Sequence, residues 1–256
     1  TVISQGVSGV ACLVYMVKKF EILRIRREEW KVDGHMMMVL CGMGVPMGLQ
    51  YSITAIGSIL LQTAVNGLGA VSMAAVAASG KVTGLFASPY DAMGTMAATY
   101  AGQNLGAGKL DRVHHGVKDC CILGVAYSLA ALVVMYFLGA QMTALFLDSK
   151  DVASSAQILP LARQLLVTNA AFYIPLLGVN LFRFTIQGLG YSNLAVIAGV
   201  SEMIARGAVA ALVSVFGFTA VCYASPAAWV LADCFLLPAY FVCMKRRTKE
   251  AAAARE

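Results

Sequence analysis

Ionisable side chains that interrupt long apolar stretches are the residues of this sequence whose types and spacing could do chemistry. They are Lys81, Asp91, Glu202, Arg206 and Asp233. A charge inside a membrane costs roughly 3 kcal/mol or more unless it is paired or hydrated, so each is a candidate binding residue. Glu202 and Arg206 are four residues apart, which places them on one helical face. That face either holds a structural ion pair or lines a cavity and contacts a cation or a substrate.

Most of these charged residues are predicted to lie near the middle of the membrane. The charges of Lys81, Glu202, Arg206 and Asp233 sum to zero, which suits a self-compensated cluster inside a helix bundle. Asp91 is predicted nearer the cytoplasmic end of its span. There its carboxylate either caps a helix or pins a loop, or it takes part in binding.

Uncharged polar side chains form a second set of candidates. Gln50 and Tyr51 follow Pro46, and a bend at this proline would open the backbone toward the interior of the bundle. The other members of this set are Asn66, Asn180 and Gln187, the last two on either side of Arg183. These groups either form hydrogen bonds between helices or line a cavity, and a cavity role is favoured for Gln50 and Tyr51.

The composition indicates that a membrane surrounds the elements that position these residues. Hydrophobic residues make up 59% of the chain and charged residues 12%, against about 25% charged in soluble domains. The mean hydropathy is +0.75, and a membrane-spanning helix needs about 20 mostly apolar residues. The sequence predicts an all-α, polytopic membrane helix bundle with seven transmembrane helices. They cover residues 2–17, 36–62, 72–100, 119–139, 158–182, 193–215 and 224–244.

Prolines lie inside several of the predicted spans, at Pro46, Pro89, Pro175 and Pro238. A proline removes one backbone hydrogen bond and permits a bend in a membrane helix. Each bend is either a static kink or a hinge for the alternating movement of a transporter.

Basic residues are predicted to gather on one side of the membrane. The segments that contain them are 18–35, 101–118, 183–192 and the tail after 244, whereas 63–71 and 216–223 have none and 140–157 has Lys150. Positive loops stay in the cytoplasm, so alternating helices predict a multi-pass protein of the inner (plasma) membrane with a cytoplasmic C-terminus. The net charge of +6 is not gathered on one face of a polar domain, which excludes a nucleic-acid partner.

The sequence offers no pattern for catalysis, a metal or an organic cofactor. Its seven cysteines include no C-x-x-C pair, so we interpret them as free apolar fillers. Motifs such as H-E-x-x-H and G-x-S-x-G do not occur, which predicts that the protein is not an enzyme. The chain opens with Thr1 inside an apolar stretch. We therefore expect no signal peptide and a sequence that begins partway through a longer protein.

Three motifs carry a family resemblance. The pattern G-x-P-x-x-x-Q occupies 44–50, V-N-x-L-G occupies 65–69, and G-Q-N-x-G-A-G-K-x-D-R occupies 102–112. Together with the stretches at 198–206 and 232–240, they make the chain resemble multidrug and toxic compound extrusion (MATE) transporters, from the end of their sixth helix to their twelfth. The resemblance covers essentially the whole chain.

The resemblance implies a domain organisation and a function. Residues 1–35 correspond to the end of the last N-lobe helix and the cytoplasmic inter-lobe loop, 36–244 to the C-terminal six-helix lobe, and 245–256 to a basic cytoplasmic tail. It further implies a secondary antiporter that exports drugs or organic cations in exchange for Na+ or H+. Its partners would be membrane lipids and the missing N-terminal lobe. The acid that some members place after the helix-seven proline is absent after Pro46, and another coupling acid lies in a first helix outside this chain. The sequence therefore assigns no binding site to the coupling cation, whether Na+ or H+.

The residue types of the third motif suit the end of a helix. Its glycines permit a tight turn, Gln103 and Asn104 can cap the helix, and basic residues can hold the loop at an anionic membrane surface. The candidate residues of this cytoplasmic loop motif are Asp91, Gln103, Asn104, Gly106, Lys109 and Arg112. Two alternatives stay open for the function. One is a flippase for lipid-linked substrates from the same superfamily, and the other is a transport-incompetent half that needs a partner.

Overall fold

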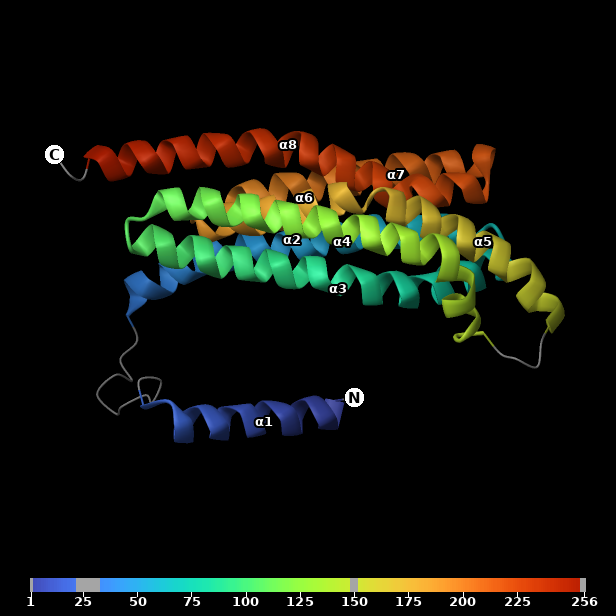
Figure 1. Ribbon diagram of the computed structural model, residues 1–256, viewed down its shortest axis with the longest axis horizontal. Coiled ribbons are helices and arrows are strands. Elements are labelled where there is room, and N and C mark those ends of the chain that lie inside the picture. The colour runs from blue at the N-terminus through green and yellow to red at the C-terminus, as the bar shows by residue number, and fades with distance from the viewer. Residues whose placement is uncertain (1, 22–32, 148–151, 254–256) are drawn as a thin grey trace. The chain divides into compact units, whose positions relative to one another are not determined.

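The computed structural model of the chain describes residues 2–21, 33–147 and 152–253. Some basic residues of the predicted loops lie outside these ranges, namely Arg24, Arg26, Arg27 and Lys31 of loop 18–35 and Lys150 of loop 140–157. The described residues form α1 (Val2–Lys19), α2 (Gly34–Asn66), α3 (Ala70–Gly106), α4 (Leu110–Ala144), α5 (Val152–Ala171), α6 (Tyr173–Gly188), α7 (Ser192–Phe216) and α8 (Phe218–Ala253). The all-α fold expected from the sequence is confirmed (Figure 1).

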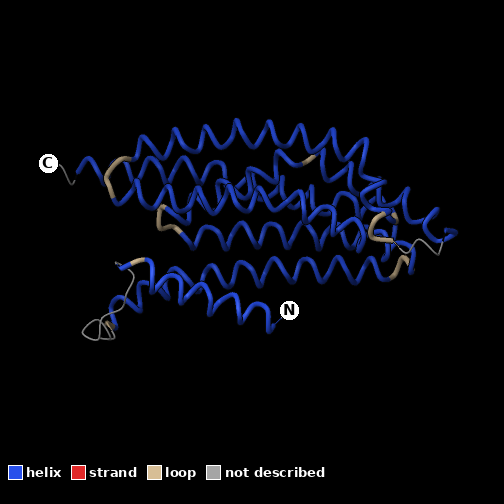
Figure 2. The backbone as a smooth tube through the Cα atoms, turned by 60° about the horizontal axis from the view of Figure 1, so that its bottom comes forward, coloured by secondary structure: helices blue, strands red, loops and turns tan. Residues whose placement is uncertain are grey.

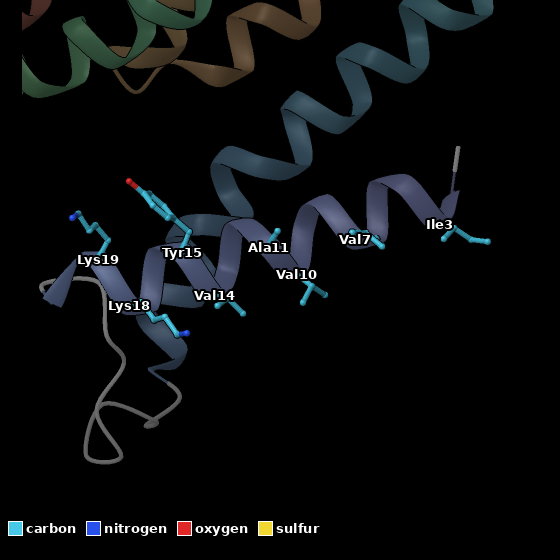
Figure 3. A pocket seen from close by; sticks show the side chains of 9 residues that line it. Ile3, Val7, Val10, Ala11, Val14, Tyr15, Lys18 and Lys19 are labelled. Carbon is cyan, nitrogen blue, oxygen red and sulfur yellow. The ribbon is translucent and has the colours of Figure 1, made fainter.

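The chain divides into two compact units, Thr1–Cys41 and Gly42–Glu256. In the first unit, α1 buries none of its residues. Figure 3 shows Ile3, Val7, Val10 and Val14 along α1, and together with Lys18 they line a shallow groove formed by this helix alone. α1 is not among the helices that are apolar enough to cross a membrane, because Gln5 and its terminal lysines lower its hydropathy.

The second unit contains the spans that position the candidate residues. The helices α2, α3, α4, α7 and α8 are each long and apolar enough to cross a membrane, and α5 and α6 together form a sixth, bent span. The predicted span 158–182 is therefore two helices that meet at Phe172 with a bend of 52°. Pro175 explains the break, because it has no N–H to donate to the carbonyl of Ala171 four residues earlier.

Helices extend further than the hydropathy pattern predicts, and the loops are correspondingly shorter. The predicted loop 101–118 is in fact a turn at 107–109, since α3 continues to Gly106 and α4 begins at Leu110. Gly108 has a φ of 68°, a left-handed conformation that favours glycine. The predicted turn 183–192 is likewise wrong at its start, because Arg183 lies inside α6. The basic tail after 244 continues α8 as helix to Ala253.

The turns of the second unit lie at two opposite ends of the bundle. Figures 1 and 2 show the α3–α4 turn and the C-terminal end of α8 at one end, with the α2–α3 and α7–α8 turns at the other. Lys109 lies in the α3–α4 turn, Arg112 follows it, and Lys245 and Arg246 lie near the end of α8. These two basic segments thus share one end, as the alternation of helices predicts, whereas Arg183 of the predicted segment 183–192 is buried inside α6.

Aromatic side chains fill the interior next to the α5–α6 bend. Tyr90 and Tyr173 are both fully buried, and their ring centroids lie 5.6 Å apart. Tyr90 also forms a 2.8 Å hydrogen bond with Ser128 of α4. This cluster ties α3, α4 and α6 together beside the bend.

Candidate functional site

A buried ion-pair network joins α6 to α7. Glu202 is 3% exposed, and its Oε1 accepts a hydrogen bond from Nη2 of Arg183 on α6. Its Oε2 lies 3.2 Å from Nη2 of Arg206, one turn along α7. The pair expected between Glu202 and Arg206 is present. The sequence prediction missed Arg183, because the polar residues that follow it made this segment look like a turn.

Asp233 of α8 completes the charge of this network. Its carboxylate rests on the backbone of Gly178 in α6, where an added Cβ would lie 2.8 Å from Oδ1. Asp233 also lies close enough to Arg183 and Glu202 to interact with them electrostatically. The formal charges of these two arginines and two acids sum to zero. The predicted cluster is wrong in one member, because its second cation is Arg183 and not Lys81. Lys81 lies on the surface of α3, with Nζ 5.4 Å from the ring centroid of Phe146.

Helix α2 approaches this network through glycines and one buried amide. Gln50 is 2% exposed, and its Oε1 accepts a 2.8 Å hydrogen bond from Nε2 of Gln187 on α6. Gly199 of α7 leaves space for the side chain of Gln50, since an added Cβ would lie 3.3 Å from its Cγ. An added Cβ at Gly57 would likewise lie 3.0 Å from Cα of Met203. The network is therefore covered by helix on the α2 side.

Some buried polar atoms of the network have no hydrogen-bond partner among the described residues. They are Nε of Arg183, Nη1 of Arg206, Oδ1 of Asp233 and Oε1 of Gln187. Both donors and acceptors occur among them, so the network can accept further hydrogen bonds without a change in its net charge.

A second set of polar side chains lies on the surface of α3. Ser88, Thr95 and Thr99 recur at steps of seven and four residues, so they share one face of the helix. Lys81 lies on the same face, Asp91 lies at its edge, and all five side chains are exposed. We call these five residues the polar face of α3.

Hydrogen bonds within the polar face orient its hydroxyl groups. Oγ1 of Thr95 donates to the carbonyl oxygen of Asp91 at 2.8 Å, and Oγ1 of Thr99 donates to the carbonyl oxygen of Thr95 at 3.0 Å. Each hydroxyl proton is thus engaged with the helix, and the hydroxyl lone pairs remain available to a ligand. No described basic side chain forms an ion pair with Asp91. The exposed polar face can therefore bind a cation through oxygen atoms.

Asp91 occupies a different position from the one predicted. It lies 15 residues before Gly106, the last residue of α3, which is about 23 Å along the helix axis. A role as a cap or a loop-pinning group at the end of the span is excluded, because Asp91 is well inside the helix. The reason is that α3 continues regularly through the glycine-rich motif that was expected to begin the loop.

The remaining candidates lie apart from the buried network. Tyr51 is 57% exposed although it neighbours Gln50, because consecutive helical residues point in different directions. Asn66 is exposed at the end of α2, and its Oδ1 accepts a 2.9 Å hydrogen bond from Gln62. Asn180 is buried on α6 and donates to the carbonyl oxygen of Leu176 at 3.1 Å.

The cytoplasmic loop motif forms the α3–α4 turn. The carbonyl oxygen of Asn104 accepts a 2.8 Å hydrogen bond from the backbone N–H of Lys109, which closes the turn. The side chain of Asn104 donates instead to the carbonyl oxygen of Tyr100. Gln103 precedes it, Gly106 ends α3, and Arg112 is exposed on the first turn of α4.

Comparison with known proteins decides the family. The family model described as MatE matches residues 46–226. This range covers most of the second unit, including the polar face of α3 and Arg183, Glu202 and Arg206 of the buried network, but not Asp233. The chain belongs to the MATE transporter family. As a MATE transporter chain with several apolar helices, it is an integral, multi-pass membrane protein.

Relatives and solved structures agree with this assignment. This chain is 26% identical to the probable multidrug resistance protein YpnP of Bacillus subtilis (strain 168) over 194 residues. The aligned region covers 74% of this chain and 40% of that relative. Its fold matches the Vibrio cholerae MATE transporter VcmN in the bent form with a TM-score of 0.80 and 16% identity, over 96% of this chain and 55% of that one. It also matches a MOP superfamily transporter from Pyrococcus furiosus with a TM-score of 0.66 and 20% identity, over 77% of this chain and 43% of that one. The chain thus spans about half the length of the proteins it matches.

Proposed function

We propose that this chain is the C-terminal half of a MATE antiporter that exports drugs or other organic cations in exchange for Na+ or H+. Membership of the MATE family supports a transport function. The name of the relative YpnP, a probable multidrug resistance protein, supports drug export. The chain spans 40% of that relative, and its motifs resemble the second six-helix lobe. The missing partner is then the N-terminal lobe.

The observation that carries the proposal is the exposed carboxylate of Asp91 inside a membrane-spanning helix. A charged carboxylate that faced acyl chains would cost roughly 3 kcal/mol or more. The polar face of α3 is therefore turned toward the water-filled path between the two lobes. There the charge of Asp91 attracts a cation, and the hydroxyl oxygens of Thr95 and Thr99 can replace part of its hydration shell.

Lys81 does not neutralise Asp91 on this face. The two residues are ten positions apart on α3, which separates them by about 15 Å along the helix axis. The ammonium group of Lys81 also lies over the ring of Phe146. The end of the polar face near Asp91 is therefore the negative one, and it is where an organic cation or the coupling ion binds.

The buried network around Glu202 acts as a structural element in this proposal. Both arginines are paired with the same glutamate, and the formal charges of the group sum to zero when Asp233 is included. A flippase for anionic lipid-linked substrates would require unpaired cationic side chains, whereas these arginines are engaged and buried. The network holds α6, α7 and α8 together, whereas the polar face of α3 binds the cation.

The C-terminus lies in the cytoplasm of a cell whose inner membrane holds the protein. The basic end of the bundle, which contains the α3–α4 turn and the end of α8, supports this orientation because positive segments stay in the cytoplasm.

Efflux of ethidium from intact cells tests the function and the half-protein assignment separately. We expect efflux from cells that express the full-length gene, and none from cells that express only this chain. Full efflux from the chain alone would contradict its assignment as half of a transporter. Absence of efflux from the full-length gene would contradict the transport function. Imposed Na+ and H+ gradients in proteoliposomes then identify the coupling ion.

A further inference from the structure

The C-terminal end of α8 presents basic residues directly beside exposed apolar ones. Val242, Arg246 and Lys249 recur at steps of four and three residues, so they share one face of the helix with Lys245 next to them. Val242 is 66% exposed and the side chain of Arg246 69% exposed. This face changes from apolar to cationic within one helical turn, as a surface at the boundary of a membrane does.

Arg247, next to this face, anchors α8 to the turn between α6 and α7. Its Nε and Nη2 both donate to the carbonyl oxygen of Leu189, at 3.0 and 2.7 Å. Its guanidinium also lies over the ring of Tyr191, 4.7 Å from the centroid. Gly190 has a φ of 90°, a conformation that favours glycine. A Cβ added at this position would lie only 2.9 Å from Nη2 of Arg247. The relative position of the turn and the helix is thus fixed by several contacts.

A groove runs between the anchored turn and α8. It has a volume of about 350 Å³ and is lined on one side by Tyr191, Asn193 and Leu194, and on the other by Val242 and Arg246. A second hollow, lined by Lys245, Arg246 and Lys249, adjoins it on α8. Among the residues that the structure describes, Glu250 is the one acid that lines this hollow, and it pairs with Arg246 and Arg247. The local charge therefore remains positive.

We propose that this groove binds the headgroup of an anionic phospholipid. The phosphate lies against Arg246 and Lys249, the amide of Asn193 provides a further hydrogen bond, and an acyl chain lies along Val242 and Leu194. Guanidinium groups bind phosphate oxygens through paired hydrogen bonds. The exposed apolar side chains beside the cations favour a lipid over a free phosphate, which would leave Val242 in water. This site is separate from the polar face of α3 and does not depend on its role.

Binding of phosphatidylglycerol by the chain purified in detergent tests the site. Native mass spectrometry counts bound lipid in the chain and in the Arg246→Gln variant, with phosphatidylcholine as a neutral lipid and inorganic phosphate as a free anion. We expect the affinity for phosphatidylglycerol to fall about fivefold in the variant, which corresponds to about 1 kcal/mol for one basic residue at an anionic surface. The matched control Lys118→Gln, which removes another exposed cation, eight residues after the start of α4, is expected to bind like the parent chain.

Several outcomes would overturn the proposal. One is an equal loss of affinity in both variants, which would indicate a general effect of net charge. Another is displacement of the lipid by millimolar inorganic phosphate, which would identify a free-anion site. An affinity for phosphatidylcholine equal to that for phosphatidylglycerol would show that the negative charge of the headgroup does not contribute to binding. The Glu250→Gln variant checks that the loss in Arg246→Gln does not come from a broken ion pair, and it is expected to bind phosphatidylglycerol at least as tightly as the parent.

Discussion

Arg183 of α6 and Glu202 of α7 form a buried ion pair, although 19 residues separate them in the sequence. Glu202 binds Arg206 through its other oxygen, so one glutamate is paired with two arginines. Removal of one member of a buried pair leaves an uncompensated charge, whereas an exposed pair contributes little. The network therefore makes Glu202 the residue on which the packing of α6 against α7 depends most.

Substitution of Glu202 by glutamine is expected to destabilise the chain by roughly 3–5 kcal/mol, because both arginines would remain buried after losing the carboxylate with which they are paired. Thermal unfolding in detergent, followed by cysteine-reactive dye fluorescence, measures the effect. Glu250→Gln is the matched control, since Glu250 also binds two arginines but at the surface. A melting temperature of Glu202→Gln equal to that of the control would contradict this account of the network.

Exchange of the charges at Glu202 and Arg206 is expected not to restore stability. In a simple pair, the double variant Glu202→Arg with Arg206→Glu would regain the attraction that each single variant loses. Here an arginine at 202 would face Arg183, so like charges would meet in the interior. The same unfolding measurement applies, and recovery of the parent melting temperature would show that Arg183 does not bind Glu202.

The hydrogen bond between Gln50 and Gln187 is expected to show strong coupling between its two ends. Gln50→Leu would leave the buried amide of Gln187 without its partner, at a cost of about 1–3 kcal/mol. The double variant Gln50→Leu with Gln187→Leu removes both polar groups and is expected to cost less than the sum of the single variants. Additive losses in a double-mutant cycle would indicate that the two amides do not interact.

Gly178 is expected to tolerate no side chain, because the carboxylate of Asp233 occupies the space above it. Gly178→Ala should destabilise the packing of α6 against α8 by about 1–3 kcal/mol. Gly84→Ala is the matched control, since Gly84 is a helical glycine with open space around its Cα, and alanine there should leave stability unchanged or slightly higher. Equal melting temperatures for the two variants would contradict the contact between the Asp233 carboxylate and Gly178.

Local sequence patterns predicted the helices, but not the partners of their polar residues. Most of the spans and the i, i+4 pair of Glu202 and Arg206 follow from hydropathy and helical spacing. Arg183 was assigned to a turn because the polar residues Thr185 and Gln187 follow it and end the apolar window. Its true environment depends on Glu202 of another helix, and the sequence contains no local sign of that contact. Lys81 was placed in the cluster for its depth alone, whereas its direction on α3 turns it to the surface.

The family resemblance came from motifs, and the comparison with known proteins confirmed it. The glycine-rich motif nevertheless misplaced Asp91. Glycine and asparagine commonly end helices, so the span was expected to stop near 100. In the structure the helix continues to Gly106, and the only positive φ of the motif belongs to Gly108. Asp91 is therefore inside a long helix, where an exposed carboxylate has a functional meaning that a loop residue would lack.

We propose that Asp91 contacts the transported or coupling cation, and ethidium efflux by the full-length transporter with Asp91→Asn tests this contact. We expect efflux to fall about tenfold at equal membrane abundance, as when a contact worth about 1.4 kcal/mol is lost, and Asp91→Glu to retain part of it. The control Asp119→Asn removes another exposed carboxylate, on α4, and should transport like the parent. Full efflux by Asp91→Asn would contradict the claim.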